Sequence, residues 1–210
     1  MAVELVLVQH GEKTRTAGDP GLTPVGRQQA ARTAAFLAGR HRSGARIDAL
    51  LASPARRTRE TAAPLAAALG LPVRLDARLR ERMNWGDVPP GQPLDAFLRE
   101  WARATADRDF VPASGESSRT AGARLLAALD DLAATGPGER LVLVTHGGVT
   151  VDLLRTLVGD GAVRRRHPAL LAQGVPPGAV TRLRRCDGGY VPVEVASVAH
   201  LDAIDRPPDS

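Results

Sequence analysis

Two segments far apart in the chain share one pattern, Leu5–Gly11 (LVLVQHG) and Leu141–Gly147 (LVLVTHG). Each apolar run predicts a strand buried on both faces, and each ends in a polar residue followed by His-Gly. In open α/β sheets, ligands bind at the carboxyl ends of the strands. One such histidine is compatible with an ordinary strand end, whereas two in the same context favour a shared site. If the two strands are neighbours, His10 and His146 face each other across one pocket.

The second copy continues into a helix that is predicted over residues 148–158. The first N–H groups of a helix lack partners within the helix, so they suit an anion. We therefore expect Gly147 to contribute to an anion site beside the two histidines. A glycine at this place also lets a ligand approach the backbone closely.

Strands and helices alternate along the rest of the chain. Further strands are predicted over residues 49–52, 73–75, 180–184 and 190–195, and further helices over residues 24–39, 54–69, 93–108 and 117–134. Thr23-Pro24 is typical of a helix start, and Gly70 of a helix end. This alternation predicts an α/β fold, a three-layer sandwich with a largely parallel central sheet and helices on both faces.

The length of 210 residues favours one domain, which we place at residues 1–204. The turn-rich stretch Trp85–Pro93 (WGDVPPGQP) predicts the start of a lid, within a cap inserted at about residues 76–118. Residues 205–210 are polar and contain proline, so we expect a flexible tail.

The composition is that of a globular protein, with 43% hydrophobic and 24% charged residues. The one cysteine, Cys186, cannot form an internal disulfide and fits a reducing compartment. No apolar run approaches the ~20 residues of a membrane span, and the first residues lack the basic region of a signal peptide. These features predict a cytoplasmic protein with no membrane partner.

The net charge is +5, and Lys13 is the only lysine among the 28 basic residues. Nucleic-acid binding needs basic residues gathered in a stripe, often with aromatic platforms. Here the arginines are scattered among acidic residues and aromatic residues make up only 3%. We therefore expect no nucleic-acid partner.

A third candidate segment is Ser53–Ala62 (SPARRTRETA), where a predicted strand turns into a helix. An arginine in the first helical turn can point back toward the strand ends and bind phosphate bidentately. The alternative is a solvated helix face, because Arg56, Arg57 and Arg59 cannot all reach the pocket.

Together with two further short motifs, these segments resemble a known family. The motifs follow in the order His10-Gly11-Glu12, Ser53-Pro54-x-x-Arg57 with Thr61-Ala62, Leu79–Arg82 (LRER), Gly115–Ser117 (GES) and Thr145–Gly148 (THGG). This series is similar to the histidine phosphatase superfamily, the phosphoglycerate-mutase-like proteins, over roughly residues 3–200. The resemblance implies the α/β fold described above and phosphoryl-transfer chemistry.

The resemblance also implies roles for individual residues. His10 would be the nucleophile that carries a phosphohistidine, which divides the transfer into two displacements. His146 and Arg57 would bind the phosphoryl oxygens and stabilise the charge that develops on them. Gln9 and Gly147 would complete the phosphate site.

A general acid must protonate the departing oxygen. One branch of the family places this acid directly after the second histidine, where this chain has Gly147, so that branch is excluded. The other branch places it in the Leu-x-Glu block, which points to Glu81. The alternative for Glu81 is a surface carboxylate paired with Arg80 or Arg82. We expect Glu116 to support the start of its helix instead.

The chain departs from the family's Arg-His-Gly pattern, because Gln9 precedes His10. Glutamine carries no charge, and losing a charge-assisted hydrogen bond costs roughly 1.5–3 kcal/mol. Lys13, Arg15 or Arg56 could supply the missing charge. A catalytically silenced relative that binds a phosphorylated ligand or partner is the main alternative to an enzyme.

Mutases of this family carry a Trp-Asn pair in the loop after the first histidine, whereas residues 13–19 here read KTRTAGD. We therefore favour a phosphatase that acts on a small phosphorylated metabolite, with water as the final acceptor. The expected lid residues, which would choose the substrate, are Thr16, Arg82, Trp85, Asp87, Trp101 and Arg103. The sequence leaves a homodimer open.

A metal-dependent hydrolase is a further alternative, because His10, His146, Glu12 and Glu81 could in principle bind zinc. These residues lack the close ligand spacing of a dedicated metal motif, and an arginine-lined pocket repels cations. We expect no metal and no cofactor.

Overall fold

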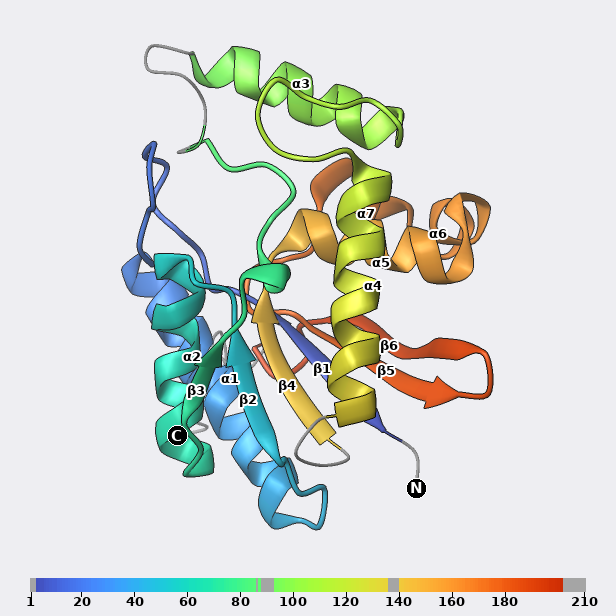
Figure 1. Ribbon diagram of the computed structural model, residues 1–210. Helices are drawn as coiled ribbons and strands as arrows, with labels where there is room; N and C mark the ends of the chain where they lie inside the picture. Colours follow the sequence, from blue (N-terminus) through green and yellow to red (C-terminus); the bar gives the residue numbers. More distant parts are fainter. Residues whose placement is uncertain (1–2, 86, 88–92, 136–139, 202–210) are drawn as a thin grey trace, which may run out of the picture.

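A six-stranded sheet in the order β3-β2-β4-β1-β5-β6 forms the centre of the computed structural model, which describes residues 3–85, 87, 93–135 and 140–201 (Figure 1). The strands are β1 (Glu4–Gln9), β2 (Ala49–Ala52), β3 (Val73–Leu75), β4 (Arg140–Thr145), β5 (Val180–Cys186) and β6 (Gly189–Ser197). The first four strands in this order run parallel, and β5 and β6 are antiparallel to their neighbours. The predicted α/β fold with a largely parallel sheet is confirmed.

The helices lie in two layers and a cap. They are α1 (Pro24–Arg42), α2 (Arg56–Leu69), the 3-10 helix η1 (Ala77–Leu79), α3 (Leu94–Ala106), α4 (Ser118–Thr135), α5 (Gly147–Val158), α6 (Asp160–Arg166) and α7 (Pro168–Gln173). None of the described helices is long and apolar enough to cross a membrane.

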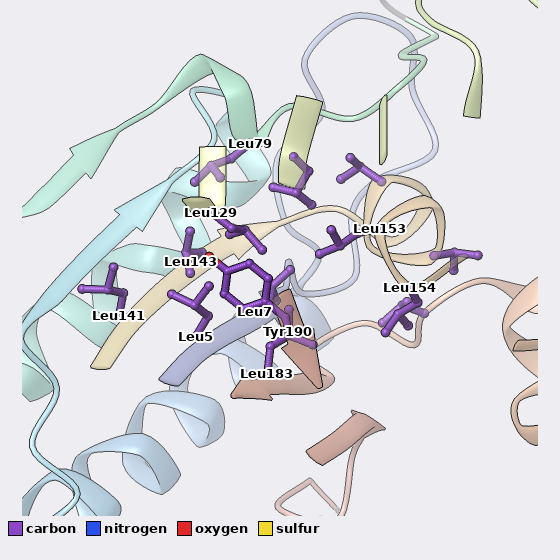
Figure 2. Packing of buried hydrophobic residues seen from close by; sticks show 14 of the residues in the cluster. Leu5, Leu7, Leu79, Leu129, Leu141, Leu143, Leu153, Leu154, Leu183 and Tyr190 are labelled. Atoms are coloured by element: carbon purple, nitrogen blue, oxygen red, sulfur yellow. The ribbon is translucent and has the colours of Figure 1, made fainter. Parts of the chain in front are cut away.

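The alternation of leucine and valine in β1 and β4 decides which core each side chain enters. The two strands pair in register, with Leu5 opposite Leu141 and Val6 opposite Val142. Because successive side chains of a strand point to opposite faces, all leucines of the two runs share one face. They pack with α4 and α5, as Figure 2 shows, whereas the valines pack against α1 and α2.

Most predicted helix ends agree with the structure. The Thr23 hydroxyl accepts the N–H of Gly26 at the start of α1, and Gly70 ends α2 in the left-handed region at φ 67°. The helix α1 continues to Arg42, beyond the predicted end at residue 39. The short helices α6 and α7, of seven and six residues, were not predicted.

A small third core holds the cap over the carboxyl ends of the strands, where Figure 1 shows α3 above the sheet. It consists of Met83, Phe97 and Ala104, with Trp85, Trp101 and Phe110 packed against them. The elements η1 and α3 lie in the predicted cap insertion, between β3 and α4. Most of the turn-rich stretch 85–93 and the predicted tail 205–210 lie outside the described residues.

Candidate active site

The two histidines lie side by side because their strands are neighbours. β1 and β4 are parallel, with Gln9 opposite Thr145, so His10 and His146 leave the sheet at the same level. The backbone N–H of His10 donates to the carbonyl of Thr145 at 3.2 Å. The two rings meet edge to face, with centroids 5.4 Å apart. The condition for a shared site, that the two strands are neighbours, is therefore met.

The His10 ring presents an unprotonated Nε2 to the site. Its Nδ1–H donates to the carbonyl of Gly11 at 2.7 Å, which assigns the proton to Nδ1. Nε2 then accepts from Arg57 Nε at 3.3 Å and from Gln9 Nε2 at 3.4 Å. Burial, and next the charge of Arg57, lower the pKa of His10 to about 3. At neutral pH the ring is therefore uncharged and has a lone pair on Nε2.

Arg57 comes from the first turn of α2 and is buried, with 4% of its surface exposed. Its Nη1 is buried without a hydrogen-bond partner and lies 3.8 Å from the carboxylate of Asp19. One turn later, Thr61 accepts the N–H of Gly11 at 3.0 Å and donates to the carbonyl of Arg57. Arg56 instead binds Glu60 at the surface. The alternative of a solvated helix face thus holds for Arg56 and fails for Arg57.

His146 faces the same site from the end of β4. Its Nε2 lies 2.9 Å from the hydroxyl of Ser53, and its Nδ1 is buried without a partner. Burial, and next the charge of Arg57, lower the pKa of His146 well below its usual value. Sequence reasoning quoted Ser53 as part of a motif and assigned it no role, although it orients this ring.

The Glu81 carboxylate binds the N-terminus of α5. Oε2 accepts the N–H of Gly148 at 2.9 Å, and Oε1 accepts the N–H groups of Val149 and Arg82 at 2.7 and 2.9 Å. The residue before α5, His146, provides no side-chain cap, so Glu81 takes that role across the chain.

The predicted alternative for Glu81, a surface ion pair, is not observed. Arg80 pairs with Glu116, and Arg82 pairs with the buried carboxylate of Asp152. Glu116 also binds Arg124 on α4, a contact that ties it to the body of the helix it was expected to support.

Three cavities of about 660, 520 and 200 Å³ surround this carboxylate, and Glu81 lines all of them. The largest also contains Gln9, His10 and Gly147, and the second contains His146 and Arg57. All residues predicted for catalysis and phosphate binding therefore line the two larger cavities, which share Glu81.

The predicted lid residues lie at different places around the site. Thr16 and Trp85 line the smallest cavity together with His10, and Asp87 lines the second. Trp101 lines the largest and the smallest. Arg103 is exposed and stacks on Phe110, apart from the residues that line these cavities.

Arg82 is engaged in holding the cap. It binds Asp152 on α5 at 2.9 Å, donates to the hydroxyl of Thr105 and stacks on the Trp101 ring at 4.2 Å. Asp152 in turn accepts from Ser118 at 2.6 Å. Sequence reasoning missed this network, although a carboxylate inside the apolar α5 segment was a signal for a buried partner.

Comparison with known proteins identifies the family. The sequence model of the histidine phosphatase superfamily (branch 1) matches residues 5–197. The chain belongs to this superfamily.

Relatives of this histidine phosphatase superfamily member include mutase-like and phosphatase proteins. The chain is 32% identical over 227 residues to a protein named probable phosphoglycerate mutase GpmB from Yersinia enterocolitica, covering 95% of each chain. Among solved structures, it is similar to mycobacterial hydrolase 1, with a TM-score of 0.74 and 27% identity over 94% of this chain and 99% of that one. A mycobacterial glucosyl-3-phosphoglycerate phosphatase matches with a TM-score of 0.70 and 27% identity over 92% and 98%.

Proposed function

We propose that this protein is a metal-independent phosphatase that hydrolyses small-molecule phosphomonoesters through a phosphohistidine on His10. The observation that carries the proposal is the His10 ring, whose unprotonated Nε2 faces Arg57 inside a cavity. A neutral imidazole with a fixed lone pair is the form that attacks phosphorus. The phosphatases among the structural relatives support the same chemistry.

In the first step, His10 Nε2 forms a bond to phosphorus as the ester P–O bond breaks. Arg57 Nη1 and His146 Nδ1, both buried without hydrogen-bond partners, are suited to bind the phosphoryl oxygens. Glu81, in its protonated form, gives its proton to the leaving oxygen, so the alcohol departs neutral.

In the second step, water attacks the phosphohistidine. Glu81, now a carboxylate, takes the proton of the water as the new P–O bond forms. The N–P bond breaks, its electron pair returns to His10 Nε2, and inorganic phosphate leaves. Glu81 lines the same cavities as His10, so one carboxyl group is placed to serve both steps.

The surroundings of the two histidines support a reaction without a metal ion. Across the described residues, no three His, Cys, Asp or Glu side chains gather in a way that would hold a metal. Glu12, one of the four residues of the zinc alternative, accepts a hydrogen bond from Thr23 at 2.8 Å. Arg57 beside His10 disfavours a cation.

Two other functions deserve a direct test. Gln9 stands where the family pattern has arginine, which favours a silenced relative that binds a phosphorylated ligand without turnover. The name of the Yersinia relative favours a mutase, which would return the phosphoryl group to its substrate. The phosphatase differs from both because it releases inorganic phosphate continuously.

Rapid quench with a 32P-labelled phosphomonoester tests the proposal, in buffer with and without a chelator. We expect an acid-labile, base-stable phosphoenzyme that is absent in His10→Ala, with steady phosphate release that the chelator does not change. A wild-type level of phosphoenzyme in His10→Ala would refute the assignment of the nucleophile. Phosphate binding without any turnover would establish the silenced relative.

A further inference from the structure

The phosphate site has an uncharged residue where the family pattern has a charged one. Gln9 is buried, its Nε2 faces His10 Nε2, and its Oε1 has no hydrogen-bond partner. Of the two side chains within hydrogen-bond distance of His10 Nε2, Arg57 is charged and Gln9 is not. A second positive charge would strengthen binding, because charge-assisted hydrogen bonds are the strong ones.

The loop after His10 presents Lys13 to this place. The backbone of Lys13 pairs with Leu22 in an antiparallel bridge, and the next residue, Thr14, donates its N–H to the carbonyl of Gly21. These contacts fix the loop. The Lys13 side chain is half-buried and lines both the largest and the smallest cavity together with His10.

The Lys13 ammonium is available for a ligand. No carboxylate among the described residues pairs with it, and the charges that act on it are those of Arg57 and Arg15. The other two candidates differ from it. Arg56 is bound to Glu60 at 2.6 Å, and Arg15 is exposed and is not among the residues that line the cavities at His10.

We propose that the Lys13 ammonium binds a phosphoryl oxygen beside His10 and supplies the positive charge that Gln9 lacks. The proposal depends on the proposed function in one respect, the position of the phosphoryl group beside His10. It explains how a chain without the family's arginine retains a cationic phosphate site.

Calorimetric binding of inorganic phosphate tests the proposal without requiring turnover. We expect Lys13→Met to weaken binding by about 10- to 150-fold, the range for a lost charge-assisted bond. Arg15→Met, which removes the same charge from the same loop, should change binding by less than about threefold because that side chain is exposed. Adding Gln9→Arg to Lys13→Met should recover most of the lost affinity.

Equal weakening by Lys13→Met and Arg15→Met would overturn the proposal, as would a double variant that binds no better than Lys13→Met. Thermal melts of every variant verify the fold. If phosphate binding follows these expectations while no ester is hydrolysed, the role of Lys13 stands and the phosphatase function fails.

A second inference comes from the walls of the largest cavity. From His10 the cavity extends to a wall formed by α3, α5, α7 and the segment that follows α7. The apolar side chains of this wall are Trp101, Ala102, Ala106, Val151, Leu170, Leu171, Ala172 and Val175. Its volume of about 660 Å³ lies within the range of sites for drug-sized ligands.

The polar groups next to Trp101 are already paired, whereas Arg164 and Gln173 line the cavity with exposed side chains. Arg155 binds Asp160 at 3.0 Å and the carbonyl of Thr105 at 2.8 Å. The Thr105 hydroxyl donates to the carbonyl of Trp101 and accepts from Arg82. An apolar leaving group placed against Trp101 and Leu171 would remove these half-buried side chains from water.

From this lining we infer that the substrate is a phosphomonoester whose leaving group carries an apolar chain or ring, seated between Trp101 and Leu171. The inference takes the position of the phosphate from the proposed function. A preference for apolar leaving groups would distinguish this chain from enzymes whose substrates are short, hydroxylated acids.

Binding of a series of linear alkylphosphonates, from methyl to hexyl, tests this inference by calorimetry. These compounds are not hydrolysed, so the measurement is independent of the reaction. We expect affinity to rise by up to about fourfold for each added methylene group. In Leu171→Ser the gain per methylene should be smaller, whereas Val191→Ser, which changes an exposed side chain of β6, should leave it unchanged. Affinity that does not rise with chain length, or rises equally in Leu171→Ser, would overturn the inference.

Discussion

Replacing Glu81 by glutamine separates the two tasks that the structure gives to this carboxylate. One task is chemical, since Glu81 lines both cavities that contain His10. The other is structural, since its two oxygens accept the N–H groups of Gly148, Val149 and Arg82. Glutamine has almost the same shape but keeps only one acceptor oxygen.

The structural cost follows from these bonds. A glutamine oxygen in the place of Oε1 can still accept from Val149 and Arg82, but its amide group then faces the N–H of Gly148. Loss of one bond to a charged group, with loss of a negative charge at a helix N-terminus, costs about 2 kcal/mol at this partly exposed position. Urea unfolding of Glu81→Gln should show a decrease of this size in the free energy of unfolding.

The chemical cost should depend on the leaving group. For alkyl phosphates, whose alkoxide leaves poorly, we expect kcat/KM to fall by about 10²- to 10⁴-fold, the usual contribution of general acid catalysis. For p-nitrophenyl phosphate, which needs little protonation, the fall in the same constant should be below about tenfold. Measuring kcat/KM for both ester classes in one preparation gives the comparison.

Equal losses for both ester classes would refute the role of Glu81 as a proton donor and leave only its contact with α5. Glu116→Gln is the matched control, since Glu116 lines the second cavity but pairs with Arg80 and Arg124. That variant should alter kcat/KM equally and only slightly for the two classes.

Three further perturbations test the frame around the site. In Gly11→Ala, the new Cβ would lie 2.3 Å from a backbone carbonyl oxygen of α1, so the loop should shift and activity should be lost. The control Gly39→Ala, whose Cβ has no atom within 4 Å, should raise the melting temperature slightly. Asp152→Asn should lower the free energy of unfolding by about 3–5 kcal/mol in urea titrations, because it leaves the Arg82 charge buried and unpaired. The double replacement Arg82→Met with Asp152→Leu should lower this free energy much less. Because burial lowers the pKa of His10 from 6.5 to about 3, the unfolded chain binds this proton first as the pH falls, and stability should decrease through that window. The decrease should be less steep in His10→Asn, by up to about 1.4 kcal/mol per pH unit, in urea titrations between pH 6.5 and 4.5.

The sequence alone determined the features that depend on residues close together in the chain. Alternating leucine and valine in β1 and β4 predicts strands buried on both faces, because side chains alternate with a period of two. The start of α1 at Thr23 and the end of α2 at Gly70 followed from caps that act within one turn. The catalytic candidates came from motifs whose order resembles a known family.

Only the tertiary structure decided which of these segments meet. Ser53 orients His146 across 93 residues, Glu81 reaches Gly148 across 67, and Arg82 binds Asp152 across 70. Such contacts depend on the order of strands in the sheet and on the direction of each side chain, and no local pattern encodes either. For this reason the sequence could not decide whether Glu81 forms a surface ion pair or belongs to the site. It also left three basic residues open as the partner of the phosphate, whereas the fold brings Lys13 to the cavities at His10.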